Sequence, residues 1–177
     1  SNEASLELEV NQVDVAFLLD TTGSMSGTAD AMAEEFGDIV TDLNGTIADG
    51  GYGFATYDDY SYGGMGGSVD RPFILRQQMS TDPALVQSAL DAIVMHSGGD
   101  WEESGMEALY QGLTGIGYDQ NADAVFDSTT DVLPFFADMD DVFNGGETGT
   151  YNAAVPGSGV NGGYGFRDGS LPVIVYA

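Results

Sequence analysis

The chain contains no cysteine and no lysine, and its only basic residues are Arg71, Arg76 and Arg167. The lack of cysteine excludes disulfides, thiolate metal ligands and cysteine nucleophiles. Against three basic residues stand 29 acidic ones, which gives a net charge of −26. Phosphate contacts require clustered cations, so this charge argues against nucleic acid and anionic membranes as partners. The carboxylates therefore either bind cations or form a solvated acidic surface.

Long apolar runs are also lacking. No run approaches the roughly 20 residues that a membrane-spanning helix needs, so we expect no membrane insertion. The first residues, Ser1-Asn2-Glu3, are polar and acidic and do not form a signal peptide. The chain does have 42% hydrophobic residues in a length of 177. That content suits a single domain with a buried core.

Apolar runs alternate with helical patterns along the chain. Residues 13–19 are almost continuously apolar, which is typical of a buried parallel strand. Apolar residues at helical spacing follow and end at Asn44-Gly45. The other predicted elements are strands at 51–57, 71–78 and 171–177, a helix from Asp82-Pro83 and a helix at 102–113. This order predicts an α/β fold, a doubly wound and mostly parallel sheet flanked by helices, with ligands at the carboxyl ends of the strands.

Residues 118–170 are rich in glycine and acidic residues and have no clear periodicity. A stretch of this length is unusual inside a compact domain. We interpret it as a long insertion within one domain that spans residues 1–177. Its loop from Asp119 to Asp127 has the alternating oxygens of a calcium loop, without the glycine and glutamate of an EF-hand. Ca²⁺ in this insertion is therefore one hypothesis.

The strand predicted at 171–177 has nothing after it. If it pairs beside residues 13–19, its other edge is open, long and apolar, an arrangement that soluble proteins avoid. We therefore expect a cover over this edge. A C-terminal segment of the same protein or another copy of the chain could supply it.

The loop after the first strand carries the strongest functional pattern. Asp20, Thr22 and Ser24 alternate along it, and alternate side chains of a tight loop can converge on one point. A carboxylate and two hydroxyls are hard oxygen ligands, which favour Mg²⁺, Mn²⁺ or Ca²⁺ over zinc or copper. The alternative is a helix cap, because Ser and Thr are good N-caps.

Two further segments could contribute ligands. Asp100 and Glu103 follow two glycines, which let backbone approach an ion closely. Their alternative role is a capping pair, with Asp100 as the N-cap and Glu103 three residues later. Asp58 and Asp59 end the second strand, where a cation would relieve their repulsion. The alternative there is a solvated strand end.

Together these segments resemble the von Willebrand factor type A domain and its metal-ion-dependent adhesion site. The similarity runs from about residue 13 to 113 and resumes at 171. The specific parts are residues 15–25, with Asp20-Thr21-Thr22-Gly23-Ser24 at their centre, and residues 53–59 and 99–104. The last two look most like the variant of this domain in integrin β subunits.

The resemblance implies a ligand set. Asp20, Thr22, Ser24 and Glu103 would hold Mg²⁺ (or Mn²⁺), and Asp59 and Asp100 would share Glu103 to hold an adjacent Ca²⁺. Three features depart from the family pattern. Gly98 stands where the variant has an asparagine ligand, and the acidic pair of a third site is missing at residues 26–28. The family's fourth-strand Thr-Asp, expected directly after Ala177, and the last strands of the fold are absent.

The function that the resemblance implies is adhesion outside the cell, by a secreted or surface module. One coordination position of the ion would stay open for a carboxylate of a protein partner. The alternative is a structural calcium-binding domain without an open position. We expect no enzyme activity, because no Ser/His/Asp arrangement is convincing and the sole histidine, His96, is predicted to be a surface or capping residue.

Overall fold

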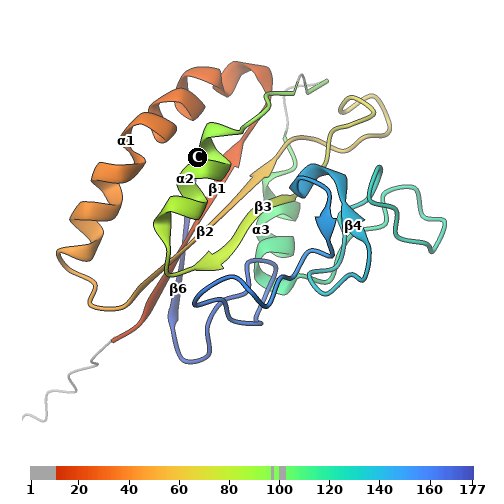
Figure 1. Ribbon diagram of the computed structural model, residues 1–177. Helices are drawn as coiled ribbons and strands as arrows, with labels where there is room; N and C mark the ends of the chain where they lie inside the picture. The colour runs from red at the N-terminus through yellow and green to blue at the C-terminus, as the bar shows by residue number, and fades with distance from the viewer. Residues whose placement is uncertain (1–10, 97, 100–102) are drawn as a thin grey trace, which may run out of the picture.

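The structure, a computed structural model, describes residues 11–96, 98–99 and 103–177. Its centre is a four-stranded sheet in the order β3-β2-β1-β6 (Figure 1). The strands are β1 (Val13–Asp20), β2 (Gly50–Tyr57), β3 (Ile74–Ser80) and β6 (Leu171–Tyr176). β1 pairs in parallel with β2 and β6, whereas β3 pairs antiparallel with β2. The prediction of an α/β fold with a mostly parallel sheet is therefore confirmed.

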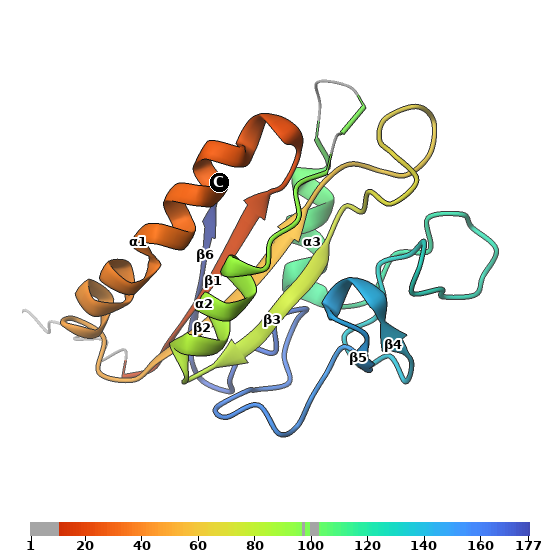
Figure 2. The same cartoon turned by 45° about the horizontal axis from the view of Figure 1, so that its top comes forward.

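Two helices cover one face of this sheet. The helix α1 (Ser26–Asn44) follows a short 3-10 turn, η1 (Gly23–Met25), and α2 (Pro83–Asp91) lies beside it (Figure 2). Phe36 and Val40 of α1 are buried against β1 and β2, as their helical spacing predicts. At the start of α2 the Asp82 carboxylate accepts a hydrogen bond from the backbone N–H of Ala84 at 3.0 Å. This is the cap that the Asp-Pro pair predicts.

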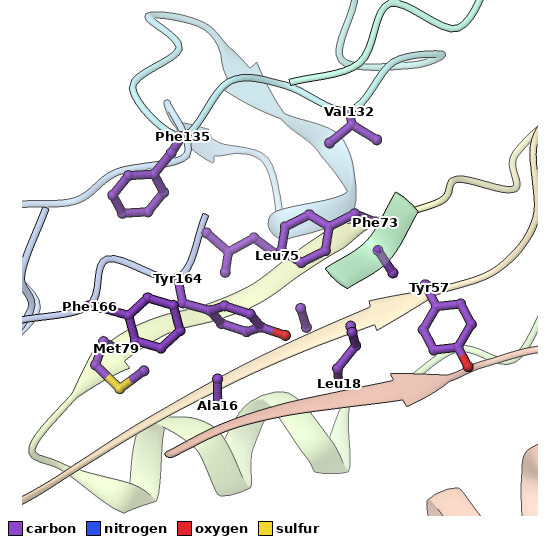
Figure 3. Close-up of a cluster of buried hydrophobic side chains, with 12 residues drawn as sticks. Ala16, Leu18, Tyr57, Phe73, Leu75, Met79, Val132, Phe135, Tyr164 and Phe166 are labelled. Carbon is purple, nitrogen blue, oxygen red and sulfur yellow. The ribbon is translucent and has the colours of Figure 1, made fainter. Parts of the chain in front are cut away.

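The opposite face is covered by α3 (Gly105–Thr114) and by the loops of residues 115–170. Within these loops the structure has only β4 (Asp140–Asp141), η2 (Val142–Asn144) and β5 (Glu147–Thr148) as short elements. Their apolar side chains nevertheless complete the core on this face (Figure 3). The buried members from the loops are Val132, Phe135, Tyr164 and Phe166.

A buried ion pair fixes the end of these loops to β1. Asp14 is fully buried, and its carboxylate accepts hydrogen bonds from Nε of Arg167 at 2.7 Å and from the Arg167 backbone N–H at 2.6 Å. The hydroxyl of Ser170 donates to the same carboxylate at 2.8 Å. The chain is thereby aligned for β6, which begins at Leu171 beside Val13.

Two element starts differ from the sequence-based prediction. β3 begins at Ile74 and not at Arg71, because the Arg71 carbonyl accepts the backbone N–H of Asp58 at 2.8 Å outside the regular ladder. α3 begins at Gly105, three residues later than predicted. Its N-cap residue Ser104 instead donates its hydroxyl to the Asp58 carbonyl at 2.7 Å. Glu103 therefore precedes α3, whose N-cap residue is Ser104; the alternative of a capping pair involves Asp100, which lies outside the described residues.

β6 lies at the edge of the described sheet, with β1 as its partner. Its exposed apolar side chains are Leu171, Val173, Val175 and Tyr176. An open apolar edge was the expectation for this strand, and what covers it stays a prediction. No helix of the described residues has the length and apolar character to cross a membrane.

Candidate metal-binding site

The predicted ligands follow strands whose carboxyl ends meet at one edge of the sheet. Asp20 and Tyr57 are register partners at the ends of β1 and β2, and the N–H of Thr21 donates to the Tyr57 carbonyl at 2.9 Å. The loop that follows Asp20 and the Asp58-Asp59 pair therefore lie next to each other. This is the edge at which α/β sheets hold ligands.

Asp20 and Thr22 are both buried and directly bonded. One carboxylate oxygen of Asp20 accepts hydrogen bonds from the backbone N–H and the hydroxyl of Thr22, both at 2.7 Å. The Thr22 side chain makes no cap bond to η1, and α1 has Met25 at its N-cap position. The alternative, in which these side chains cap a helix, is therefore wrong. Ser24 lies in η1 and is exposed, so the loop opens to solvent on its side.

Gly98 brings Glu103 to this loop. A Cβ atom built on Gly98 would lie 3.2 Å from Cγ2 of Thr22 and 3.4 Å from Oε1 of Glu103, so the two side chains flank the same glycine. Gly98 has a φ of +63°, in the left-handed region that favours glycine. Thr22 and Glu103 therefore both approach Gly98, and their sharing of an ion stays a prediction.

Tyr57, at the end of β2, is affected by the charges of both carboxylates. Desolvation by burial and the hydrogen bond to Tyr176 raise the pKa of Tyr57, and the charges of Tyr176, Asp20 and Glu103 raise it further. The Tyr57 hydroxyl donates to that of Tyr176 at 2.6 Å, and the two rings are stacked. Asp20 and Glu103 thus act on one hydroxyl at the end of β2.

The remaining predicted ligands are Asp59 and Asp100. Asp59 is buried, and its Cβ would lie 3.0 Å from a Cβ built on Gly66. Its carboxylate accepts the backbone N–H of Tyr60 at 2.7 Å. The alternative of a solvated strand end is therefore wrong for Asp59, and also for Asp58, which is fully buried. Asp100 lies outside the described residues.

A second group of polar side chains lies close together next to the loop that follows β1, and the sequence analysis did not predict it. Potential ligand atoms of Asp58, Asp70 and His96 all lie within 4.8 Å of one another. Nδ1 of His96 is 2.7 Å from Oδ2 of Asp58 and 3.8 Å from Oδ1 of Asp70. His96 is thus neither a surface nor a capping residue, because its side chain is only 11% exposed and contacts Asp58.

Three backbone and side-chain contacts hold this Asp58–Asp70–His96 cluster. The Thr21 hydroxyl donates to Oδ1 of Asp58 at 2.6 Å, and the N–H of His96 donates to the Thr21 carbonyl at 2.8 Å. The N–H of Gly67 donates to Oδ2 of Asp70 at 2.7 Å. The hydrogen bond with Asp58 raises the pKa of His96 against the effect of burial, and the charges of Asp58 and Asp70 add to the rise.

The carboxylates of the predicted calcium loop bond to the loop's own backbone. Asp119 accepts the N–H of Ala124 at 2.7 Å, and Asp131, which lies just beyond the predicted loop, accepts the N–H groups of Gln120 at 3.0 Å and Asp127 at 2.8 Å. Ca²⁺ in this region stays a hypothesis.

No family model matches the chain, and no curated protein matches it either. What the site can do is therefore inferred from its geometry. Asp20, Thr22 and Glu103 offer hard oxygens at a loop that is open beside Ser24. Such a donor set suits a hard divalent cation.

Proposed function

We propose that the chain is an adhesion module of the von Willebrand factor type A kind, which binds an acidic group of a protein partner through a divalent cation. The cation, Mg²⁺ or Mn²⁺, is held by Asp20, Thr22, Ser24 and Glu103. The single observation that carries the proposal is that Cγ2 of Thr22 and Oε1 of Glu103 both lie within 3.4 Å of the Cβ position of Gly98, with Thr22 bonded to Asp20. The module acts outside the cell and has no catalytic role.

The chemistry of the partner follows from the charge of the site. Only two carboxylates, Asp20 and Glu103, contribute charge among the four ligands, so the ion keeps affinity for one more anion. Ser24 at the exposed rim is where solvent, or a partner's carboxylate, reaches the ion. This exposure favours an open coordination position over a closed structural calcium site.

A metal titration with one conservative variant tests the ion. Asp20→Asn removes the charge but keeps an oxygen that can accept both bonds from Thr22. Chelator-treated wild-type protein should melt at a higher temperature when Mg²⁺ or Mn²⁺ is added, and the Asp20→Asn variant should lose most of this rise. Asp38→Asn is the matched control, because Asp38 is exposed on α1 and the charge change is the same. Equal responses of the wild type and the Asp20→Asn variant would reject the site.

The open position needs its own measurement. Mn²⁺ bound with an exchangeable water enhances the relaxation of solvent protons, and acetate should reduce this enhancement by displacing the water. Wild-type protein should show both effects. Bound Mn²⁺ without enhancement would mean a closed coordination shell, and the structural calcium alternative would then be preferred.

A further inference from the structure

We infer that Asp58, Asp70 and His96 form a second metal centre, for a divalent ion of the zinc or cobalt class. The inference is independent of the proposed function, because the two sites have no ligand in common. The three side chains come from segments far apart in the sequence: the end of β2, the loop before β3 and the loop after α2. Only the fold brings them together.

The orientation of each group points to a common centre. Asp58 uses Oδ1 to accept from Thr21 and turns Oδ2 towards His96. Asp70 uses Oδ2 to accept from the Gly67 N–H and turns Oδ1 towards the same imidazole nitrogen. In each carboxylate one oxygen is therefore fixed by a hydrogen bond, and the other oxygen faces His96. Protein groups that fix metal ligands in this way are typical of the surroundings of metal sites.

A protonated His96 would donate to the Asp58 oxygen at 2.7 Å and attract the Asp70 oxygen at 3.8 Å, which is beyond hydrogen-bond distance. A metal ion would instead hold all three ligand atoms at similar distances. A tetrahedral ion with bonds of about 2.0–2.1 Å places its ligand atoms about 3.3 Å apart. His96 and Asp58 would separate by roughly half an ångström and Asp70 would approach by a similar amount. Both movements are small for side chains.

The donor set defines the class of ion. One imidazole nitrogen and two carboxylates suit Zn²⁺, Co²⁺ or Mn²⁺ better than Ca²⁺ or Mg²⁺, which prefer oxygen alone. His96 also lines a surface cavity of about 480 Å³ with Arg76 and Phe143, whereas Asp58 and Asp70 are almost fully buried. Arg76 donates to Thr56 and to the Phe143 carbonyl, so its positive charge is already fixed in place.

The sole histidine of the chain makes the test specific. Imidazole ¹⁵N resonances of the labelled protein report on His96 alone, and Zn²⁺ on the many surface carboxylates does not shift them directly. With Mg²⁺ in excess, one equivalent of Zn²⁺ should move the Nδ1 resonance. Asp70→Asn, whose amide oxygen can still accept the Gly67 N–H, should weaken Zn²⁺ binding at least about tenfold.

Two controls separate the possible outcomes. Asp38→Asn should bind Zn²⁺ as the wild type does. Asp20→Asn should lose the Mg²⁺ response and keep the His96 response, so that failure of one site is distinguished from failure of the other. Unchanged His96 resonances, or equal shifts in the wild type and the Asp70→Asn variant, would mean an adventitious ion only and would overturn the inference.

Discussion

Gly98 offers the sharpest test of the loop that joins Thr22 and Glu103. Its φ of +63° lies in the left-handed region, and a Cβ there would lie 3.2 Å from Cγ2 of Thr22, a tight contact, and 3.4 Å from Oε1 of Glu103, an ordinary one. The substitution Gly98→Ala therefore has two effects. It strains the backbone, and it crowds the predicted ligand Thr22.

The backbone effect can be estimated and matched by a control. A non-glycine residue in the left-handed region costs about 1–2 kcal/mol. For a chain of this size that lowers the melting temperature by roughly 2–8 °C. Gly169 has a φ of +76° with open space around its Cβ position, so Gly169→Ala should show the same loss of stability without touching the site.

The effect on the ligand should appear only at Gly98. The tight contact is with Thr22, which is β-branched and whose hydroxyl is bonded to Asp20, so this predicted ligand has to shift. We expect the affinity for Mg²⁺ to fall by about tenfold. At a concentration 100 times the wild-type dissociation constant, the ion would then stabilise the variant by about 1.4 instead of 2.7 kcal/mol.

The assay is thermal unfolding with and without Mg²⁺. The rise in melting temperature caused by the ion should be about 3–5 °C smaller in Gly98→Ala than in the wild type, since 1 kcal/mol corresponds to roughly 2–4 °C. Gly169→Ala should keep the full rise. If both variants respond to Mg²⁺ as the wild type does, Thr22 does not bind the ion and the proposed ligand set is wrong.

Three other substitutions test the contacts that position the site. Thr21→Val removes the hydroxyl that donates to Asp58 at 2.6 Å, and it should lower the free energy of unfolding in urea by about 1.5–3 kcal/mol. Arg167→Leu leaves the fully buried Asp14 without its ion partner and should cost about 3–5 kcal/mol in the same measurement. Asp82→Ala removes the cap of α2 and should cost about 1 kcal/mol. If Arg167→Leu costs no more than the roughly 1 kcal/mol expected for Asp82→Ala, the buried ion pair between Arg167 and Asp14 does not stabilise the fold as expected.

The strands and helices around the site were predictable because their signals are local. The apolar run before Asp20 gives β1, and the helical spacing of Phe36 and Val40 gives α1. The start of α3 was placed too early because Ser104 bonds to Asp58, a residue 46 positions away. No local sequence pattern indicates a hydrogen bond between residues so far apart in the chain.

The Asp58–Asp70–His96 cluster was missed for the same reason. Asp70 lies in a loop and His96 follows α2, and neither stands in a recognisable spacing with the other. The parallel pairing of β1 and β2 sets Asp58 beside Thr21, and the Thr21 carbonyl then holds the backbone of His96. The available signal was the sole histidine, placed after a helix that leads back to the carboxyl edge of the sheet.

The charge of the chain decides how an acidic partner could be bound. Its three arginines are committed internally: Arg71 to Asp141, Arg167 to Asp14, and Arg76 to the Thr56 hydroxyl and a backbone carbonyl. The chain has no lysine, and each arginine already makes contacts inside the protein, which leaves little positive charge to receive a carboxylate. At a net charge of −26, an approaching anion is repelled, and this repulsion acts mainly within the screening length of about 8 Å at physiological ionic strength. A bound cation beside Ser24 reverses the sign of the field only locally. Removal of the ion should therefore abolish binding of an acidic partner. On a surface with basic residues, removal of the ion would only weaken this binding.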